Sequence, residues 1–216
     1  MRALLIVVSL ASTCCVAQAT PQSCVPPVDG VQVAVGSDDS ATVSARVKQL
    51  FDEDQAAREA FRGRAPTQEE LERLIRSDTE RRAEVLGYLR AGKLAFYHDF
   101  YHAAFIFQHG NCLEHIKLAA ELARQAMALA DTRSARWIYA AATDRYLVLQ
   151  GKPQKYGTQF SANPANGPCL YPVDPATKGR GAPGVRGTPA SRVAQEGRGQ
   201  ILRVQALATG GVVKLA

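Results

Sequence analysis

Several patterns that identify common enzymes are missing from this chain of 216 residues. It has no C-x-x-C pair, no G-x-S-x-G elbow and no H-E-x-x-H helix, so nothing indicates a thioredoxin-like redox centre, an α/β-hydrolase nucleophile or a zinc hydrolase. No integral membrane span is predicted either, because the apolar run Ala3–Leu10 is about half the roughly 20 residues that cross a bilayer.

The first nineteen residues have the features of a secretory signal peptide. Arg2 supplies a positive charge, Ala3–Leu10 an apolar stretch and Ala17-Gln18-Ala19 a small-x-small cleavage site. The pattern predicts a secreted or periplasmic protein whose mature chain starts at Thr20. A lipoprotein is the alternative, but Thr13 precedes Cys14 where lipidation normally takes Gly, Ala or Ser.

Export makes a disulfide possible. Cleavage leaves three of the five cysteines, Cys24, Cys112 and Cys169, which allow three single pairings. We favour Cys112 with Cys169, because each lies just outside a candidate helix end near the same polar motifs, whereas Cys24 lies in a proline-rich leader. Three free or intermolecularly paired thiols are the alternative.

The positive charge is concentrated in the last quarter of the chain. Of the net charge of +6, residues 161–216 contribute +5 and residues 37–160 only +1. This basic tail contains six prolines and nine glycines, so we expect loose, irregular chain. Gly179–Gly184 matches G-x-G-x-x-G, but no strand precedes it and Pro183 blocks a helix, so no cofactor is predicted. Without interleaved aromatic residues, nucleic-acid binding is not predicted either.

Helical periodicity dominates between a loose leader at 20–39 and that tail, and no convincing alternating strand pattern occurs. The pattern predicts an all-α domain at 40–160, an irregular antiparallel bundle of about five helices. Thr67 with Glu70 forms a capping box, and Asn111 with Glu114 predicts another. The third helix is apolar on almost every side, so we expect it at the centre. The predicted helices cover residues 43–61, 67–89, 97–109, 111–130 and 132–150.

Charged residues fall on the predicted apolar faces. Asp78 and Arg82 continue the apolar stripe of the second helix, and Asp144 and Arg145 continue that of the fifth. A buried charge is costly unless it is paired, so an interior Asp/Arg network suggests a functional site. Alternatively, these groups are interhelical clamps or lie at the solvated edge of the stripe.

All four histidines lie between positions 98 and 115. His98 and His102 have the i, i+4 spacing that can hold one metal ion, but no motif supplies the remaining ligands, so we prefer satisfied or exposed histidines. His109 lies beside Gln108 at a helix end, where the helix C-terminus favours the protonated ring. It is the best candidate for an acid/base or ligand-binding residue.

Four short motifs occur in this order: Asp54-Gln55 with Arg58, Gln108-His109-Gly110, Asp144-Arg145 and Gln154-x-Tyr156-Gly157-Thr158-Gln159. Together they resemble an uncharacterised bacterial family, domain of unknown function 6624, whose hallmark is a Q-x-Y-G-T-Q ending. The resemblance covers about residues 41–175, including Pro172-Val173-Asp174-Pro175, after which the family usually continues with a charged helical segment. It implies an exported protein and brings no activity with it.

These observations suggest one polar pocket. A non-catalytic module that binds a small polar ligand or an envelope protein is the preferred hypothesis, with Arg145 and the glutamines gripping a polar or anionic ligand. The alternative is a hydrolase-like enzyme with His109 as general base, Asp144 as its acidic partner, and Arg145 or Tyr156 stabilising negative charge. A third reading is that the polar set only locks the fold. The predicted ligand-binding residues are Gln55, Arg58, Gln108, His109, Asp144, Arg145, Gln154, Tyr156, Thr158 and Gln159.

Overall fold

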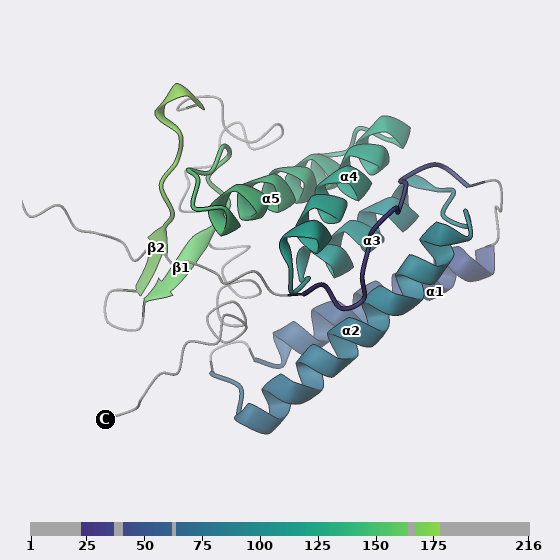
Figure 1. Cartoon of the computed structure of the whole chain (residues 1–216), viewed down its shortest axis with the longest axis horizontal. Coiled ribbons are helices and arrows are strands. Elements are labelled where there is room, and N and C mark those ends of the chain that lie inside the picture. Colours follow the sequence, from purple (N-terminus) through teal and green to yellow (C-terminus); the bar gives the residue numbers. More distant parts are fainter. Residues whose placement is uncertain (1–22, 37–40, 62–63, 164–166, 178–216) are drawn as a thin grey trace, which may run out of the picture.

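A computed structural model describes residues 23–36, 41–61, 64–163 and 167–177, and five helices pack together in it as a bundle (Figure 1). The predicted all-α bundle is therefore confirmed. None of the helices in these ranges is both long and apolar enough to cross a membrane. The predicted signal peptide and the basic tail beyond Thr177 lie outside the described residues. The helices are α1 (Ala41–Glu59), α2 (Gln68–Arg90), α3 (Tyr97–Gln108), α4 (Leu113–Leu129) and α5 (Arg133–Leu149).

The start of α2 follows the predicted capping chemistry. Thr67 Oγ1 accepts the Glu70 amide at 3.2 Å, and the Glu70 carboxylate accepts the Thr67 amide at 2.8 Å. The capping box satisfies two amides that have no partner within the helix.

The second predicted capping box is wrong. The helix α4 starts after Cys112, whose Sγ accepts the His115 amide at 3.3 Å. Asn111 does not cap the helix: its Oδ1, the atom that would accept a helix amide, has no hydrogen-bond partner among the described residues, while its side-chain NH₂ donates to the Ser23 carbonyl at 3.4 Å. A tertiary contact thus overrides the local signal.

The helix α3 is central, as predicted, since it contacts each of the other four helices. The helices α1 and α3 run parallel: Ser44 near the start of α1 donates to Asp99 near the start of α3, and Asp54 near the end of α1 contacts His109 just after α3. The last turns of both helices therefore reach the same end of the bundle. The apolar residues of α3 that are at most 1 % exposed are Phe100, Ala103, Ala104, Ile106 and Phe107.

Residues 23–36, the N-terminal strap, do not form the loose leader that composition predicts. The strap lies along the bundle (purple in Figure 1), and Val28, Val31 and Val33 pack against the hydrophobic core. Gly36 donates its amide to the Leu94 carbonyl at 2.7 Å, and a Cβ at Gly36 would lie 1.9 Å from the Gly92 oxygen, so only glycine fits. Three strap carbonyls accept hydrogen bonds from side chains of the bundle: Val25 from Arg82 at 3.3 Å, Pro26 from His115 at 2.7 Å and Pro27 from Arg90 at 3.0 Å.

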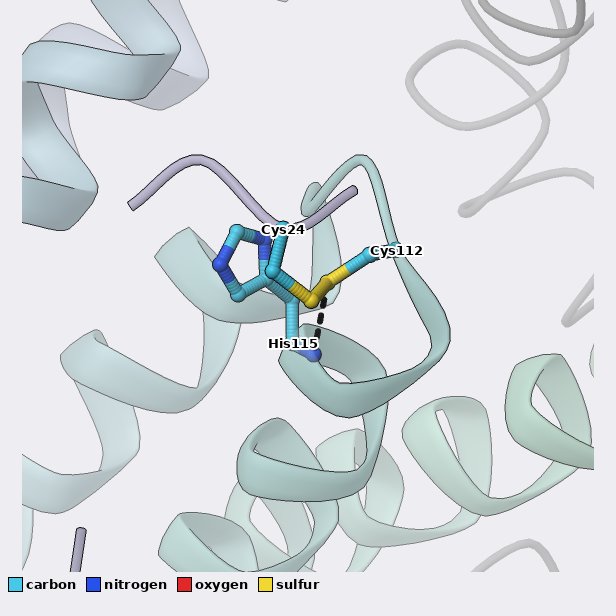
Figure 2. Close-up of side chains that lie close together, drawn as sticks. All are labelled: Cys24, Cys112 and His115. Carbon is cyan, nitrogen blue, oxygen red and sulfur yellow. Dashed lines mark hydrogen bonds between the residues drawn. A yellow bond between two sulfur atoms is a disulfide. The ribbon is translucent and has the colours of Figure 1, made fainter. Parts of the chain in front are cut away.

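A disulfide between Cys24 and Cys112 ties the N-terminal strap to the start of α4 (Figure 2). The two Cα atoms lie 5.2 Å apart, within the range that a disulfide spans. The predicted pairing of Cys112 with Cys169 is therefore wrong. The prediction placed Cys24 in a loose leader, whereas the docked strap brings Cys24 to Cys112.

A short antiparallel hairpin follows the bundle, made of β1 (Phe160–Asn163) and β2 (Gly167–Leu170). It lies beyond the end of α5 (Figure 1) and is followed by a 3₁₀ turn at Pro175–Thr177. The expectation of irregular chain from residue 161 is wrong for these strands. Four residues per strand are too few for an alternating pattern to stand out.

Removing the disulfide should destabilise the protein. In the unfolded chain the bond closes a loop across a sequence separation of 88 residues, so we expect a Cys24→Ser/Cys112→Ser variant to lose about 4 kcal/mol of unfolding free energy. Urea denaturation measures the loss. Peptide mapping without reductant should recover Cys24 joined to Cys112, and a Cys112–Cys169 peptide in that map would contradict the structure.

Candidate functional site

Oppositely charged side chains of α1 and α2 meet inside the bundle. The Arg58 guanidinium lies 2.8 Å from Asp54 of its own helix and 2.7 Å from Asp78 of α2. Asp78 also binds Arg81, at 2.6 Å. All four residues are buried. The ion pairs compensate for the hydration that each charge loses on burial.

His109, the residue after α3, joins this network through Asp54. Its Nδ1 lies 2.9 Å from Asp54 Oδ2, to which Gln55 Nε2 also donates, at 2.8 Å. Burial and the positive charge of Arg58 lower the pKa of His109, so the ring is neutral at pH 7. The protonated ring expected at a helix end is therefore not found, because burial outweighs the helix terminus.

Asp54 is held as a carboxylate by its neighbours. Burial acts to raise its pKa, but His109 and Arg58 bring the pKa below its ordinary value. A neutral imidazole beside a carboxylate donates its Nδ1–H, which leaves a lone pair on His109 Nε2. No side chain of the described chain bonds to that nitrogen.

Two further arginines have no carboxylate partner among the described residues. Arg82, 1 % exposed, donates to the His109 carbonyl at 3.2 Å and to two other uncharged oxygens. Arg145 of α5 is partly exposed and makes no hydrogen bond or ion pair within the described ranges. Burial lowers the pKa of each to about 10, and the charge of Arg58 acts in the same direction.

The arginine cluster, defined as Arg58, Arg81, Arg82 and Arg145, therefore carries more positive charge than its surroundings balance. Arg58 and Arg81 share two carboxylates, Arg82 and Arg145 contact none among the described residues, and each of the four has a buried Nε without a described partner. Unbalanced positive charge in a poorly solvated place attracts anions.

The enzyme hypothesis requires Asp144 to pair with His109, but the two side chains are not in contact. Its Oδ1 accepts the amides of Lys155 and Tyr156 at 2.7 and 2.8 Å, and its Oδ2 accepts the amide and hydroxyl of Thr158 at 2.9 and 2.8 Å. Asp144 is fully buried, and these four bonds occupy both of its oxygens. It anchors the loop that follows α5.

The two glutamines of this loop bond to backbone. Gln154 accepts the Gln159 amide at 2.8 Å and donates to the carbonyls of Gln159 and Tyr171, at 3.0 and 2.8 Å. Gln159 donates to the Ala141 carbonyl of α5 at 3.2 Å. These bonds assign Gln154, Gln159 and Thr158 to folding the loop, and the structure gives no support to their predicted ligand contacts.

Only part of the predicted pocket comes together. Gln55, Arg58 and His109 gather around Asp54, and Arg145 lies within electrostatic range of Arg58. Gln108 ends α3 with a fully buried side chain whose oxygen and nitrogen bond to no described residue.

Tyr156, the third catalytic candidate, has other neighbours. Its ring lies 6.4 Å from that of Tyr139 and under the ammonium of Lys155, and no described contact joins it to His109.

Arg81 is a site residue that the sequence prediction did not include. A signal exists in the spacing: Asp54 precedes Arg58 by four positions, and Asp78 precedes Arg81 by three. Both spacings put the charged groups on one face of a helix.

The structure does not support a metal site at the predicted pair. His98 Nε2 lies 2.7 Å from the Ser44 hydroxyl, and His102 stacks on Phe51 with ring centroids 4.7 Å apart. The two imidazole centroids are 6.2 Å apart.

A different trio has metal-ligand chemistry. Within the described ranges, Cys24, Cys112 and His115 place three ligand atoms within 4.8 Å of one another. Figure 2 shows the imidazole beside Cys24, but the two sulfurs are bonded to each other. Since a thiolate is the form that binds metal, this oxidised trio is not a metal site.

No family model, curated protein sequence or solved structure matches this chain. The resemblance to the bacterial family therefore rests on its motifs.

Replacing the loop anchor should loosen the loop. We expect Asp144→Asn to cost about 2–4 kcal/mol of unfolding free energy, because an amide NH₂ then faces backbone donors. Hydrogen exchange should accelerate at the amides of Lys155, Tyr156 and Thr158. Asp131→Asn, at an exposed carboxylate before α5, is the control and should leave these rates unchanged. Unchanged exchange at Tyr156 in Asp144→Asn would show that another contact holds the loop.

Acid should destabilise the protein through its buried histidines. Burial lowers the pKa of His102 and of His115 to about 4, whereas histidine in an unfolded chain protonates near pH 6.5. The unfolded state therefore binds more protons between these values, and the unfolding free energy falls as the pH drops from about 6.5 to 4. His102→Phe retains a ring against Phe51 and removes one of the titrating groups. Urea denaturation should show a smaller loss from pH 7 to pH 5 in this variant, and an equal loss would contradict the assignment.

Proposed function

We propose that this chain is a non-catalytic binding module for a small anionic ligand and that the arginine cluster is the binding site. The observation that carries the proposal is Arg145, a partly exposed cation that has no hydrogen-bond or ion-pair partner in the described chain and lies within electrostatic range of Arg58 and Asp78. An oxyanion is the natural partner of a guanidinium, which can donate two parallel hydrogen bonds to it.

A purely structural network does not account for Arg145. Arg58 and Arg81 already balance Asp54 and Asp78, so the clamp between α1 and α2 is complete without α5. An additional desolvated charge without a partner lowers stability. Groups that cost stability and have no structural use are typical of functional sites.

A hydrolase-like enzyme is the second candidate, with Asp54 in the place predicted for Asp144. A neutral imidazole with its Nδ1 on a carboxylate has the arrangement of a general base. However, Asp54 is also ion-paired with Arg58, and no described hydroxyl or thiol bonds to His109 Nε2. Binding without catalysis fits these contacts better.

Export is part of the proposal. The signal peptide expected at residues 1–19 and the Cys24–Cys112 disulfide both favour an oxidising compartment. Membership of the bacterial family is also part of the proposal, because three of the four motifs that resemble that family contribute residues to the site.

Replacing Arg145 separates binding from folding. In Arg145→Met the apolar stem remains and the unpaired charge is gone, so we expect the unfolding free energy to rise by about 1 kcal/mol while anion binding is lost. The measurement is the melting temperature in phosphate, sulfate or citrate buffer, compared with the melting temperature in chloride at the same ionic strength. An anion that binds the native protein should raise its melting temperature, and the same anion should leave the melting temperature of Arg145→Met unchanged.

Arg133→Gln is the matched control, since Arg133 is an exposed arginine at the start of the same helix. It should respond to anions as the native protein does. If no anion stabilises the native protein, or if Arg145→Met unfolds like a core truncation, the arginine cluster is scaffold and the proposal fails.

A further inference from the structure

The residues around the Cys24–Cys112 disulfide form a second polar cluster, which anion binding at Arg145 does not use. The imidazole of His115, on the first turn of α4, lies beside Cys24 (Figure 2). One ligand atom from each of Cys24, Cys112 and His115 lies within 4.8 Å of the other two. Cys112 and His115 are buried, and Cys24 is partly exposed. Once the disulfide is reduced, the three residues are therefore near enough to bind one ion.

The hydrogen bonding of His115 leaves one ring nitrogen available. Its Nε2 lies 2.7 Å from the Pro26 carbonyl oxygen, which can only accept, so Nε2 carries the proton. Burial lowers the pKa of His115 to about 4, so the ring is neutral at pH 7 and Nδ1 has a lone pair. This Nδ1 is buried and has no hydrogen-bond partner among the described residues. Histidines that bind metal through one nitrogen commonly donate the other N–H to a backbone carbonyl in the same way.

Two contacts fix the position of the His115 ring. A Cβ at Gly110 would lie 2.2 Å from the His115 Cβ, so the glycine makes room for this side chain. The ring also meets Phe107 edge to face, with ring centroids 5.6 Å apart. A disulfide needs no imidazole beside it, and a buried acceptor without a partner costs stability. A purely structural disulfide therefore does not account for the position of Nδ1.

The start of α4 favours the thiolate form of Cys112 after reduction. Cys112 is the N-cap residue, and its Sγ accepts the His115 amide at 3.3 Å. A thiol at a helix N-terminus loses its proton more readily than a free cysteine, and the thiolate is the form that binds metal. Two thiolates and one neutral imidazole carry two negative charges, which a divalent cation balances.

We propose that reduction of the Cys24–Cys112 disulfide creates a site for one zinc-type divalent cation, bound by the two thiolates and by Nδ1 of His115. Cysteine and histidine ligands commonly hold Zn²⁺ in tetrahedral geometry. With Zn–S bonds of about 2.3 Å the two sulfurs lie about 3.8 Å apart, which requires rotation about the Cα–Cβ bonds once the covalent bond is open. Water or the exposed Glu114 carboxylate, whose Oε2 lies 3.0 Å from Cys24 Sγ, supplies the fourth ligand.

The disulfide and the metal site exclude each other. A dithiol reductant gives two electrons and two protons to the S–S bond, becomes a disulfide itself and leaves Cys24 and Cys112 as thiols. One Zn²⁺ then displaces both thiol protons, which pass to the buffer. A disulfide oxidant takes two electrons from the two sulfurs, restores the S–S bond and releases the ion. The redox state of the surroundings therefore controls metal binding.

Titration with Co²⁺ tests the ligands, because Co²⁺ replaces Zn²⁺ and absorbs visible light in a tetrahedral site. The full chain is reduced with dithiothreitol, freed of the reductant under argon and titrated at neutral pH beside the oxidised chain. We expect the reduced chain to bind one Co²⁺ with thiolate-to-cobalt charge-transfer absorption, and Zn²⁺ to displace this ion. The oxidised chain should show no such absorption. A reduced chain without charge-transfer absorption overturns the inference.

Matched variants test whether the three residues hold the ion. His115→Gln keeps an NH₂ that can donate to the Pro26 carbonyl and removes Nδ1, so we expect the affinity for Zn²⁺ to fall at least roughly 100-fold. Cys112→Ser should lose at least as much affinity. Cys169→Ser and His98→Gln remove one sulfur and one imidazole outside the cluster and should keep the native affinity. Equal affinity in His115→Gln and in the native chain contradicts the proposed site.

Unfolding by urea gives a measurement that holds even if the reduced chain folds poorly. A metal that binds the folded state raises the urea midpoint, or refolds a chain that is unfolded without it. Zn²⁺ should therefore raise the midpoint of the reduced native chain and leave the oxidised chain unchanged. The Cys24→Ser/Cys112→Ser variant also lacks the disulfide but has no thiolates at the site, so its midpoint should not respond to Zn²⁺. An equal response in this variant and in the reduced native chain overturns the inference.

Discussion

The guanidinium of Arg58 is the group on which the other charges of the bundle depend. It lies between Asp54 and Asp78 and so joins α1 to α2. Asp54 in turn holds His109 after α3, and Asp78 holds Arg81. Without Arg58 two buried carboxylates would share the remaining cations, and a buried pair broken on one side costs several kcal/mol. The fold and the candidate site therefore share one residue.

The polar residues that hold the fold together differ from those of the candidate site in how completely they are hydrogen-bonded. The carboxylate of Asp144 has four donors, and Gln154 and Gln159 have backbone partners, so the loop after α5 needs nothing from outside. Arg145, one residue from Asp144, has no partner within the described ranges. Neighbouring positions in one motif thus have opposite roles, which residue type alone does not reveal.

The helices were predictable because their signals are local. Apolar spacing, the Thr67–Glu70 box and the all-round apolar character of α3 require no knowledge of the rest of the fold. The N-terminal strap was not predictable, because it docks largely through backbone carbonyls, which every residue carries. The contact of His109 with Asp54 depends on the parallel course of α1 and α3. The spacing of apolar residues predicts each helix but not the direction in which one helix runs relative to another. Arg58 and Arg145 could be singled out from the motifs, but their partners could not.

The disulfide divides the chain into two topological parts. Cys24 and Cys112 close a covalent ring that contains α1, α2 and α3, while α4, α5 and the hairpin follow it along the chain. Arg58, Arg81, Arg82 and His109 belong to the ring, and Arg145 lies outside it. Partial unfolding that begins at the hairpin and reaches α5 can therefore remove one wall of the site while the ring stays closed. A ligand that bridges both parts would slow this opening, and its release would report on the stability of α5 rather than on that of the whole domain.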